Sequence, residues 1–291
     1  MFEILPSYIS DKYKPFNNSL PDIISVFEGI KPMARLSCKL GENYSEFINL
    51  ARKRKVHVAD IKRGENVHVY ISKSKKIVDY YKSHDPEMKN SSTKLEIADF
   101  ARSLGYPKCC IENYLNKTQK EVMEGYQGSW NATLPFYFNN LLHSISNYYL
   151  SFHLSCTLGC EETKKYNGNI FEAIQQIEPE LGHRLKKILS LPLLVWYNTD
   201  NKYCFDDRLV VLFEGIINND LLEYSNCFIL RTNYPNNKKI SGRIESDLGY
   251  FKLGNKIRYN KKAISVFRDG AFVYEINNQP KPEYFLMKFH G

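Results

Sequence analysis

The chain has 291 residues, of which 43% are hydrophobic and 14% aromatic, which is enough to build apolar cores. No apolar run approaches the ~20 residues of a membrane-spanning helix, and the first residues lack the pattern of a secretion signal. We therefore expect a cytoplasmic protein with no membrane partner. The formal net charge of +8 is modest for this length and supports a nucleic-acid partner only weakly.

Residues 1–88 alternate between strand-like and helix-like patterns and predict a small α+β domain. Strands are expected at 23–30, 33–40, 56–63 and 66–74, and helices at 43–55 and 75–84. A run of basic residues at 52–55 ends the first helix, where cations favourably meet the negative end of the helix dipole. This run is therefore only weak support for a phosphate contact.

Residues 89–190 predict a helical domain that begins with two helices joined by a sharp corner. The first covers 93–104, has capping hydroxyls at its start, and ends at Gly105. The second begins at Pro107, because proline suits the first turn of a helix. Two adjacent cysteines fall in that first turn, where free N–H groups and the positive dipole end stabilise thiolates.

A third helix is expected at 136–153, with a broad apolar surface and a narrow stripe of uncharged polar residues. The stripe consists of Asn140, His143, Ser144, Asn147 and Ser151. A solvated face in this lysine-rich chain would carry charge, so the stripe predicts an internal partner, with Asn140 and Ser144 as candidate substrate-binding residues. In the alternative interpretation, these small polar groups bond to neighbouring backbone.

Residues 191–291 predict an antiparallel β barrel or sandwich, so that the expected fold class of the whole chain is α+β. The β-like runs are 193–199, 208–217, 226–234, 249–254, 256–260, 263–270 and 271–276. The Asp269-Gly270 pair between the last two runs is a strong hairpin signal.

Four of the seven cysteines form two pairs in the helical domain and are the candidate metal ligands. The pairs are Cys109 with Cys110 and Cys156 with Cys160, and His153 precedes the second pair. A reducing cytosol disfavours disulfides, so clustered cysteines there indicate metal or redox chemistry. The remaining cysteines are isolated in apolar runs and are expected to pack as small hydrophobic residues: Cys38, Cys204 and Cys227.

Four thiolates favour an iron-sulfur cluster or zinc among common metal centres. Zinc sites usually have Cys-x₂₋₄-Cys spacing in both halves, and only the second pair obeys it. Adjacent thiolates that diverge suit a cluster several ångströms wide, so an iron-sulfur cluster is the first expectation and zinc the alternative. Two further alternatives are a three-cysteine site with His153 or an exchangeable position as fourth ligand, and four unliganded thiols.

Two segments resemble the hallmark segments of an uncharacterised bacterial and archaeal family, a domain of unknown function. They are Gly105-Tyr106-Pro107-x-Cys109-Cys110 and His153-x-x-Cys156-x-x-x-Cys160-x-x-Thr163. The resemblance covers about residues 95–163 well and the flanks only loosely. It implies that the two segments belong to one site and implies no reaction type.

The first functional expectation is redox or Lewis-acid chemistry on a small-molecule substrate, with His153 and His143 as candidate catalytic residues. One alternative is a zinc-stapled binding module that contacts nucleic acid or protein. Another is a thiol enzyme in which Cys109 or Cys110, paired with one of these histidines, attacks a thioester or amide. The sequence motifs of nucleotide hydrolases, serine hydrolases, zincin proteases and radical-SAM enzymes are missing.

Overall fold

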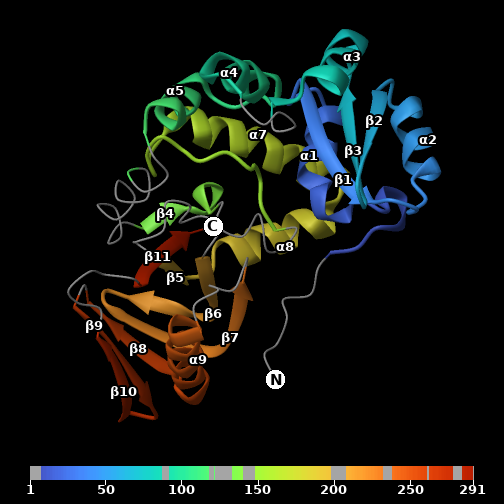
Figure 1. The fold of residues 1–291 in the computed structure, drawn as a ribbon. Coiled ribbons are helices and arrows are strands. Elements are labelled where there is room, and N and C mark those ends of the chain that lie inside the picture. Colours follow the sequence, from blue (N-terminus) through green and yellow to red (C-terminus); the bar gives the residue numbers. More distant parts are fainter. Residues whose placement is uncertain are drawn as a thin grey trace. The chain divides into compact units, whose positions relative to one another are not determined.

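A computed structural model of the chain describes residues 8–86, 92–117, 121, 133–139, 148–197, 208–231, 238–260, 262–277 and 284–290. The chain divides into two compact units (Figure 1). The cysteine unit holds Ser7–Asn116 and Ser146–Leu185, and the sheet unit holds Lys117–Ile145, Lys186–Gly291 and the first six residues. The α+β class predicted from the sequence is confirmed. Within the described ranges, no helix is both long and apolar enough to span a bilayer.

The N-terminal part of the cysteine unit contains a three-stranded antiparallel sheet flanked by helices. Strand β3 (Asn66–Ser72) lies between β1 (Met33–Lys39) and β2 (His57–Arg63). Helices α2 (Ser45–Lys53) and α3 (Lys75–His84) form where their periodicity predicts them. These elements of the predicted N-terminal domain thus lie in the same unit as the paired cysteines.

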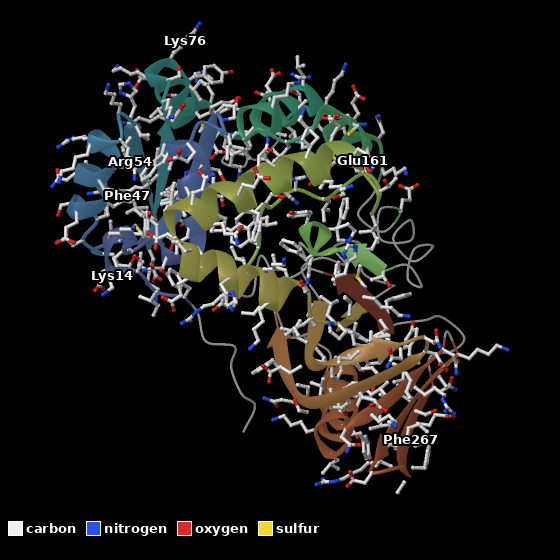
Figure 2. All side chains as sticks on the ribbon, turned by 180° about the vertical axis from the view of Figure 1, so that it is seen from behind. Lys14, Phe47, Arg54, Lys76, Glu161 and Phe267 are labelled. Atoms are coloured by element: carbon white, nitrogen blue, oxygen red, sulfur yellow. The ribbon has the colours of Figure 1, made fainter. Side chains whose placement is uncertain are left out.

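The basic run at 52–55 begins in the last turn of α2 and continues past its end, and all four residues are exposed. Arg54, which projects from the cysteine unit in Figure 2, directly follows the helix, and its Nη1 lies 3.6 Å from an oxygen of Glu28. This placement agrees with the structural interpretation of the run and leaves a phosphate contact as a prediction.

The expected first strand, 23–30, is wrong, because these residues belong mostly to helix α1 (Leu20–Phe27). Every residue of α1 is buried, and Pro21 occupies its first turn. A helix that is buried on all sides has a continuous apolar sequence, which its periodicity cannot distinguish from that of a buried strand. Helix α1 packs against α7 (Glu161–Ile177), which α8 (Pro179–Leu189) follows.

The predicted pair of helices around the Gly-Tyr-Pro corner is confirmed as α4 (Lys94–Ser103) and α5 (Lys108–Asn116). Thr93 caps α4, since its Oγ1 accepts the N–H of Glu96 at 3.2 Å and its own N–H donates to that carboxylate at 2.9 Å. This reciprocal pair is a capping box.

The helix expected at 136–153 is wrong at both of its described ends. Its N-terminal end follows strand β4 (Thr133–Pro135) and forms a 3₁₀ turn at Phe136–Phe138, and residues 148–153 are not helical. Tyr148, Tyr149, Leu150 and Ser151 are consecutive and all at most 1% exposed, a pattern that a one-sided amphipathic helix does not produce. The other stripe residues, Asn140, His143, Ser144 and Asn147, lie outside the described residues.

The sheet unit is built on an eight-stranded sheet with the order β10-β9-β8-β7-β6-β5-β11-β4. Its further strands are β5 (Leu193–Tyr197), β6 (Arg208–Asn218), β7 (Leu221–Arg231), β8 (Lys256–Tyr259), β9 (Ala263–Arg268), β10 (Ala271–Asn277) and β11 (Tyr284–His290). All neighbours pair antiparallel except β4 and β11, which are parallel. The predicted antiparallel β structure is confirmed, and among the described strands the sheet stays open with β10 and β4 at its edges.

One predicted β-like run of the sheet unit is helical, because residues 249–253 form the end of α9 (Lys238–Leu253). Leu248 and Phe251 lie three residues apart and are both fully buried, so one helix face enters the core beside β7, β9 and β10. The predicted hairpin is confirmed. Asp269 and Gly270 both have positive φ (51° and 86°), as the favoured two-residue turn requires.

Candidate metal centre

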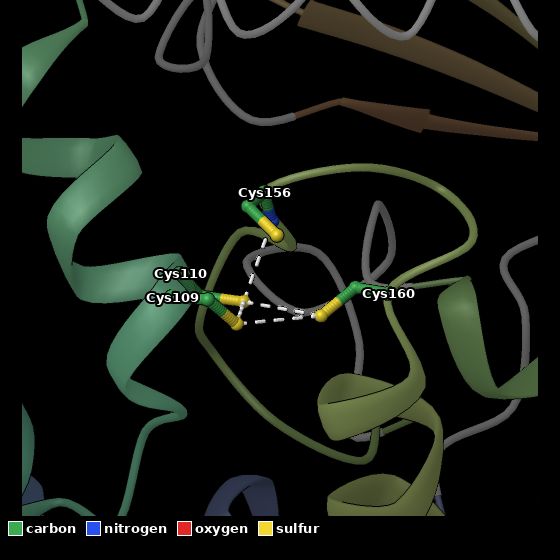
Figure 3. Close-up of side chains that lie close together, drawn as sticks. All are labelled: Cys109, Cys110, Cys156 and Cys160. Carbon is green, nitrogen blue, oxygen red and sulfur yellow. Dashed lines mark hydrogen bonds between the residues drawn. The ribbon is translucent and has the colours of Figure 1, made fainter.

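The sulfur atoms of the two cysteine pairs converge on one point in the cysteine unit (Figure 3). The Sγ of Cys109 lies 3.9 Å from that of Cys110 and 3.6 Å from that of Cys160, and the Cys110 and Cys160 sulfurs are 3.8 Å apart. With Cys156, all four sulfurs lie within 4.8 Å of one another. The predicted approach of the two cysteine pairs to one another is confirmed, and the four sulfurs could hold a metal ion.

A glycine corner brings the first pair to this point. Gly105 has φ +81°, a left-handed conformation that glycine adopts without strain, and its N–H donates to the carbonyl of Arg102 at 2.9 Å. A Cβ atom at this position would lie 3.1 Å from Cδ of Pro32. The carbonyl of Pro107 then accepts the N–H of Cys110 at 3.0 Å, which starts α5 with both cysteines in its first turn.

The second pair lies in the loop that leads into α7. Cys160 is the N-cap of that helix, which begins at Glu161 (Figure 2), and its Sγ accepts the N–H of Thr163 at 3.5 Å. The N–H of Cys156 donates to the sulfur of Cys110 at 3.3 Å and so ties the loop to α5. Backbone donors that point at sulfur stabilise the thiolate form that binds metals.

The four thiols differ in exposure and in acidity. Cys110 and Cys160 are buried, whereas Cys109 and Cys156 are half-buried. Burial raises the pKa of Cys110, and burial together with neighbouring thiols raises that of Cys156 to about 11. Burial also opposes ionisation of Cys160, but hydrogen bonds from Thr163 and from the neighbouring thiols lower its pKa to about 7. Four thiolates this close repel one another, and a bound cation removes that repulsion.

His153 lies behind Thr163 as seen from the sulfurs. Its Nε2 is 3.0 Å from Oγ1 of Thr163, its Nδ1 is 2.9 Å from Oγ of Ser151, and Oγ1 of Thr163 is 3.2 Å from Sγ of Cys110. Burial, and then the positive charge of Lys31, lower the pKa of His153 to about 3, so its ring is neutral at physiological pH. The other candidate catalytic histidine, His143, lies outside the described residues, as do Asn140 and Ser144.

The structure adds a group of buried polar residues that sequence reasoning missed. Lys31, 2% exposed, forms an ion pair with Asp22 of α1, and Tyr149 donates from its hydroxyl to Asp22 at 2.7 Å. The ring of Tyr106 lies 5.2 Å from that of His153 and 5.6 Å from Nζ of Lys31. The sequence did contain one indication of this buried ion pair, because the oppositely charged Asp22 and Lys31 stand on either side of a mostly apolar run.

Among the described residues, the four-sulfur group does not include the isolated cysteines Cys38 and Cys227. Cys38 in β1 and Cys227 in β7 are buried, and Cys227 belongs to the apolar core of the sheet unit. Cys204 lies outside the described residues.

No protein family, curated protein or solved structure matches this chain at a significant level. The resemblance to a domain of unknown function therefore stays a prediction, and the geometry of the site carries the functional argument.

Proposed function

We propose that Cys109, Cys110, Cys156 and Cys160 bind one metal ion and that this ion is zinc. The separation of the sulfurs supports the proposal. Four sulfurs at a Zn–S distance of about 2.3 Å form a tetrahedron with edges of about 3.8 Å. Three of the separations in the site are 3.6, 3.8 and 3.9 Å.

The same distances weaken the case for an iron-sulfur cluster. That case assumed that adjacent cysteines diverge, whereas the sulfurs of Cys109 and Cys110 lie only 3.9 Å apart. In a cubane cluster each thiolate binds a different iron, which needs wider sulfur separations than a single ion does. The iron-sulfur cluster is the alternative that metal analysis has to exclude.

Four protein thiolates fill all coordination positions of a tetrahedral zinc ion, and zinc sites of this kind stabilise the fold rather than catalyse a reaction. Here the ion would join the start of α5, which carries Cys109, to the start of α7, where Cys160 is the N-cap. These two cysteines are 51 positions apart in the sequence. Because the ion binds the folded site and not the unfolded chain, its binding free energy adds to the stability of the folded unit. We therefore place the protein among zinc-stapled binding modules, with nucleic acid or protein as the partner class.

The thiol-enzyme alternative fits the site less well. A general base that activates a thiol works best with a pKa near the working pH, and the pKa of His153 is about 3. Its two ring nitrogens lie within hydrogen-bond distance of Thr163 and Ser151. Small-substrate chemistry at the metal would need an open coordination position, which four thiolate ligands do not leave.

Anaerobic titration of the metal-free protein with Co²⁺ tests the proposal. We expect saturation at about one equivalent with the intense sulfur-to-cobalt absorption of a tetrahedral four-thiolate site, and displacement of Co²⁺ by zinc. Cys110→Ser should weaken the absorption and the affinity, whereas the matched variant Cys227→Ser should match the wild type. A weak octahedral spectrum, or an equal loss in both variants, contradicts the proposal. A spectrum that changes when small thiols or carboxylates are added indicates an open position and supports catalysis instead.

A further inference from the structure

We propose that Ser151, His153 and Thr163 form a buried chain of hydrogen bonds that directs one donor onto the sulfur of Cys110 and so strengthens metal binding. All three are positioning residues, because they act on the metal through its ligand. The inference rests on the proposed four-thiolate site and names the residues that tune it.

The chain is continuous and shielded from solvent. Its three separations are 2.9 Å from Ser151 Oγ to His153 Nδ1, 3.0 Å from His153 Nε2 to Thr163 Oγ1, and 3.2 Å from that oxygen to Cys110 Sγ. Ser151 and Thr163 are fully buried and His153 is 5% exposed. Hydrogen bonds in such an interior are stronger than in water, and a lost partner there is costly.

Metal binding fixes the direction of the contact between Thr163 and Cys110. A metal-bound thiolate has no proton, so this 3.2 Å contact is a hydrogen bond only when the hydroxyl of Thr163 is the donor. The oxygen of Thr163 then accepts from Nε2–H of His153. A neutral ring with its proton on Nε2 has a bare Nδ1, which accepts the hydroxyl proton of Ser151.

The surroundings keep His153 in the neutral form that this arrangement requires. The ring of Tyr106 lies near both Lys31 and His153, at 5.6 Å from the ammonium and 5.2 Å from the imidazole. Asp22 pairs with Lys31 and so keeps that cation in the interior. A second positive charge on His153 would be buried near the first, and the pKa of about 3 reflects that cost.

The hydroxyl of Thr163 is the part of this arrangement that a substitution can remove cleanly. The N–H groups of Cys156 and Thr163 also point at sulfurs, at 3.3 and 3.5 Å, and they remain whichever side chain occupies position 163. Thr163→Val keeps the shape of the side chain and removes the hydroxyl, which is both the donor to Cys110 and the acceptor for His153. Loss of such an outer hydrogen bond typically weakens metal binding about 10- to 100-fold.

Three full-length variants test the inference by zinc competition with a chelator and by the sulfur-to-cobalt band of the Co²⁺ form. We expect Thr163→Val to bind zinc about 10- to 100-fold more weakly and to shift the band to lower energy, because the sulfur becomes more electron-rich. Thr163→Ser should restore both values. Thr157→Val is the matched control, since Thr157 is exposed on the neighbouring loop, and it should equal the wild type.

A ¹⁵N NMR measurement on the zinc-loaded wild type is independent of any variant's folding. We expect His153 to be neutral with its proton on Nε2; a proton on Nδ1 overturns the inference. If the wild type binds zinc and Thr163→Val has the same zinc affinity and the same sulfur-to-cobalt band, this inference alone is overturned. A wild type that takes up no zinc overturns the proposed function and this inference together.

Discussion

The apolar core of the sheet unit differs in character from the part of the cysteine unit that surrounds the four sulfurs. The sheet unit buries a cluster of aliphatic and aromatic residues that includes Trp196, Phe213 and Phe251. In the cysteine unit, the interior next to the four sulfurs contains a buried ion pair, Asp22 with Lys31, and a chain of hydrogen-bonded polar side chains. An apolar core is stabilised by removal of its surface from water, whereas a polar interior is stable only when each group keeps its partner.

Cys227 and Cys110 show what this difference means for one residue type. Both are buried, at 5% and 2% exposure. Cys227 packs among apolar side chains as a small hydrophobic residue. Cys110 faces sulfur atoms, a hydroxyl and a backbone N–H, which suit a metal-bound thiolate, although burial raises the pKa of the free thiol. Burial alone therefore does not separate a packing cysteine from a ligand; the neighbouring groups do.

The largest expected effect comes from breaking the buried ion pair. Lys31→Met leaves the carboxylate of Asp22 buried without its cation, which should lower the free energy of unfolding of the cysteine unit by about 3 to 5 kcal/mol. Arg102→Met, which removes an exposed partner of Asp99, is the control and should change stability little. Urea unfolding followed by circular dichroism measures both. Equal small losses would show that the polar interior does not depend on its partners.

Removal of zinc should affect one unit and spare the other. At free zinc 100 times the dissociation constant, the ion contributes about 2.7 kcal/mol to the folded cysteine unit. Chelation should therefore increase amide hydrogen exchange in α5 and the first turn of α7. Exchange in β6 and β7 should stay constant, because both strands belong to the sheet unit. An equal increase of hydrogen exchange in both units would contradict the expectation that zinc stabilises only the cysteine unit.

Truncation of the packing cysteines should have a smaller effect that does not involve the metal. Cys227→Ala and Cys38→Ala remove a small buried side chain each, which should cost about 1 to 2 kcal/mol. Bound zinc, measured by elemental analysis, should equal that of the wild type in both variants. Loss of metal in either variant would mean that the substituted cysteine takes part in metal binding.

The smallest effect is a difference in rate within the site. In the metal-free protein, an alkylating reagent reaches the half-buried Cys109 more easily than the adjacent Cys110, which is buried and whose pKa burial raises. Mass spectrometry at short reaction times should find Cys109 modified before Cys110, and zinc should protect all four cysteines. Uniform rates without zinc would mean that the site opens as a whole before it reacts.

Local features of the site were predictable from the sequence. Gly105, Pro107 and the adjacent cysteines act through nearby backbone geometry, so the corner and the place of Cys109 and Cys110 in the first turn of α5 follow from residue type. The clustering of the cysteines indicated metal or redox chemistry, and the family resemblance implied that the two pairs belong to one site. Its geometry was not, because the sulfur separations depend on how the loop before α7 folds back.

Features that depend on distant contacts were missed. Lys31 and Asp22 pair because the segment between them is helical, and a fully buried helix has the sequence of a buried strand. The role of Thr163 depends on His153, which lies ten residues before it and reaches it only through the folded loop. The polar stripe was expected on one long helix, but Ser151 lies in non-helical chain and bonds to His153 instead.

The central claim is that four thiolates hold one zinc ion, and the metal content of the anaerobically purified protein tests it most directly. Zinc, iron and acid-labile sulfide are measured per chain on the same sample, together with free thiols after denaturation. The account predicts about one zinc per chain, no sulfide and seven thiols, because the ion requires reduced ligands. Iron with an equivalent amount of sulfide, or no metal beside four reactive thiols, would contradict it.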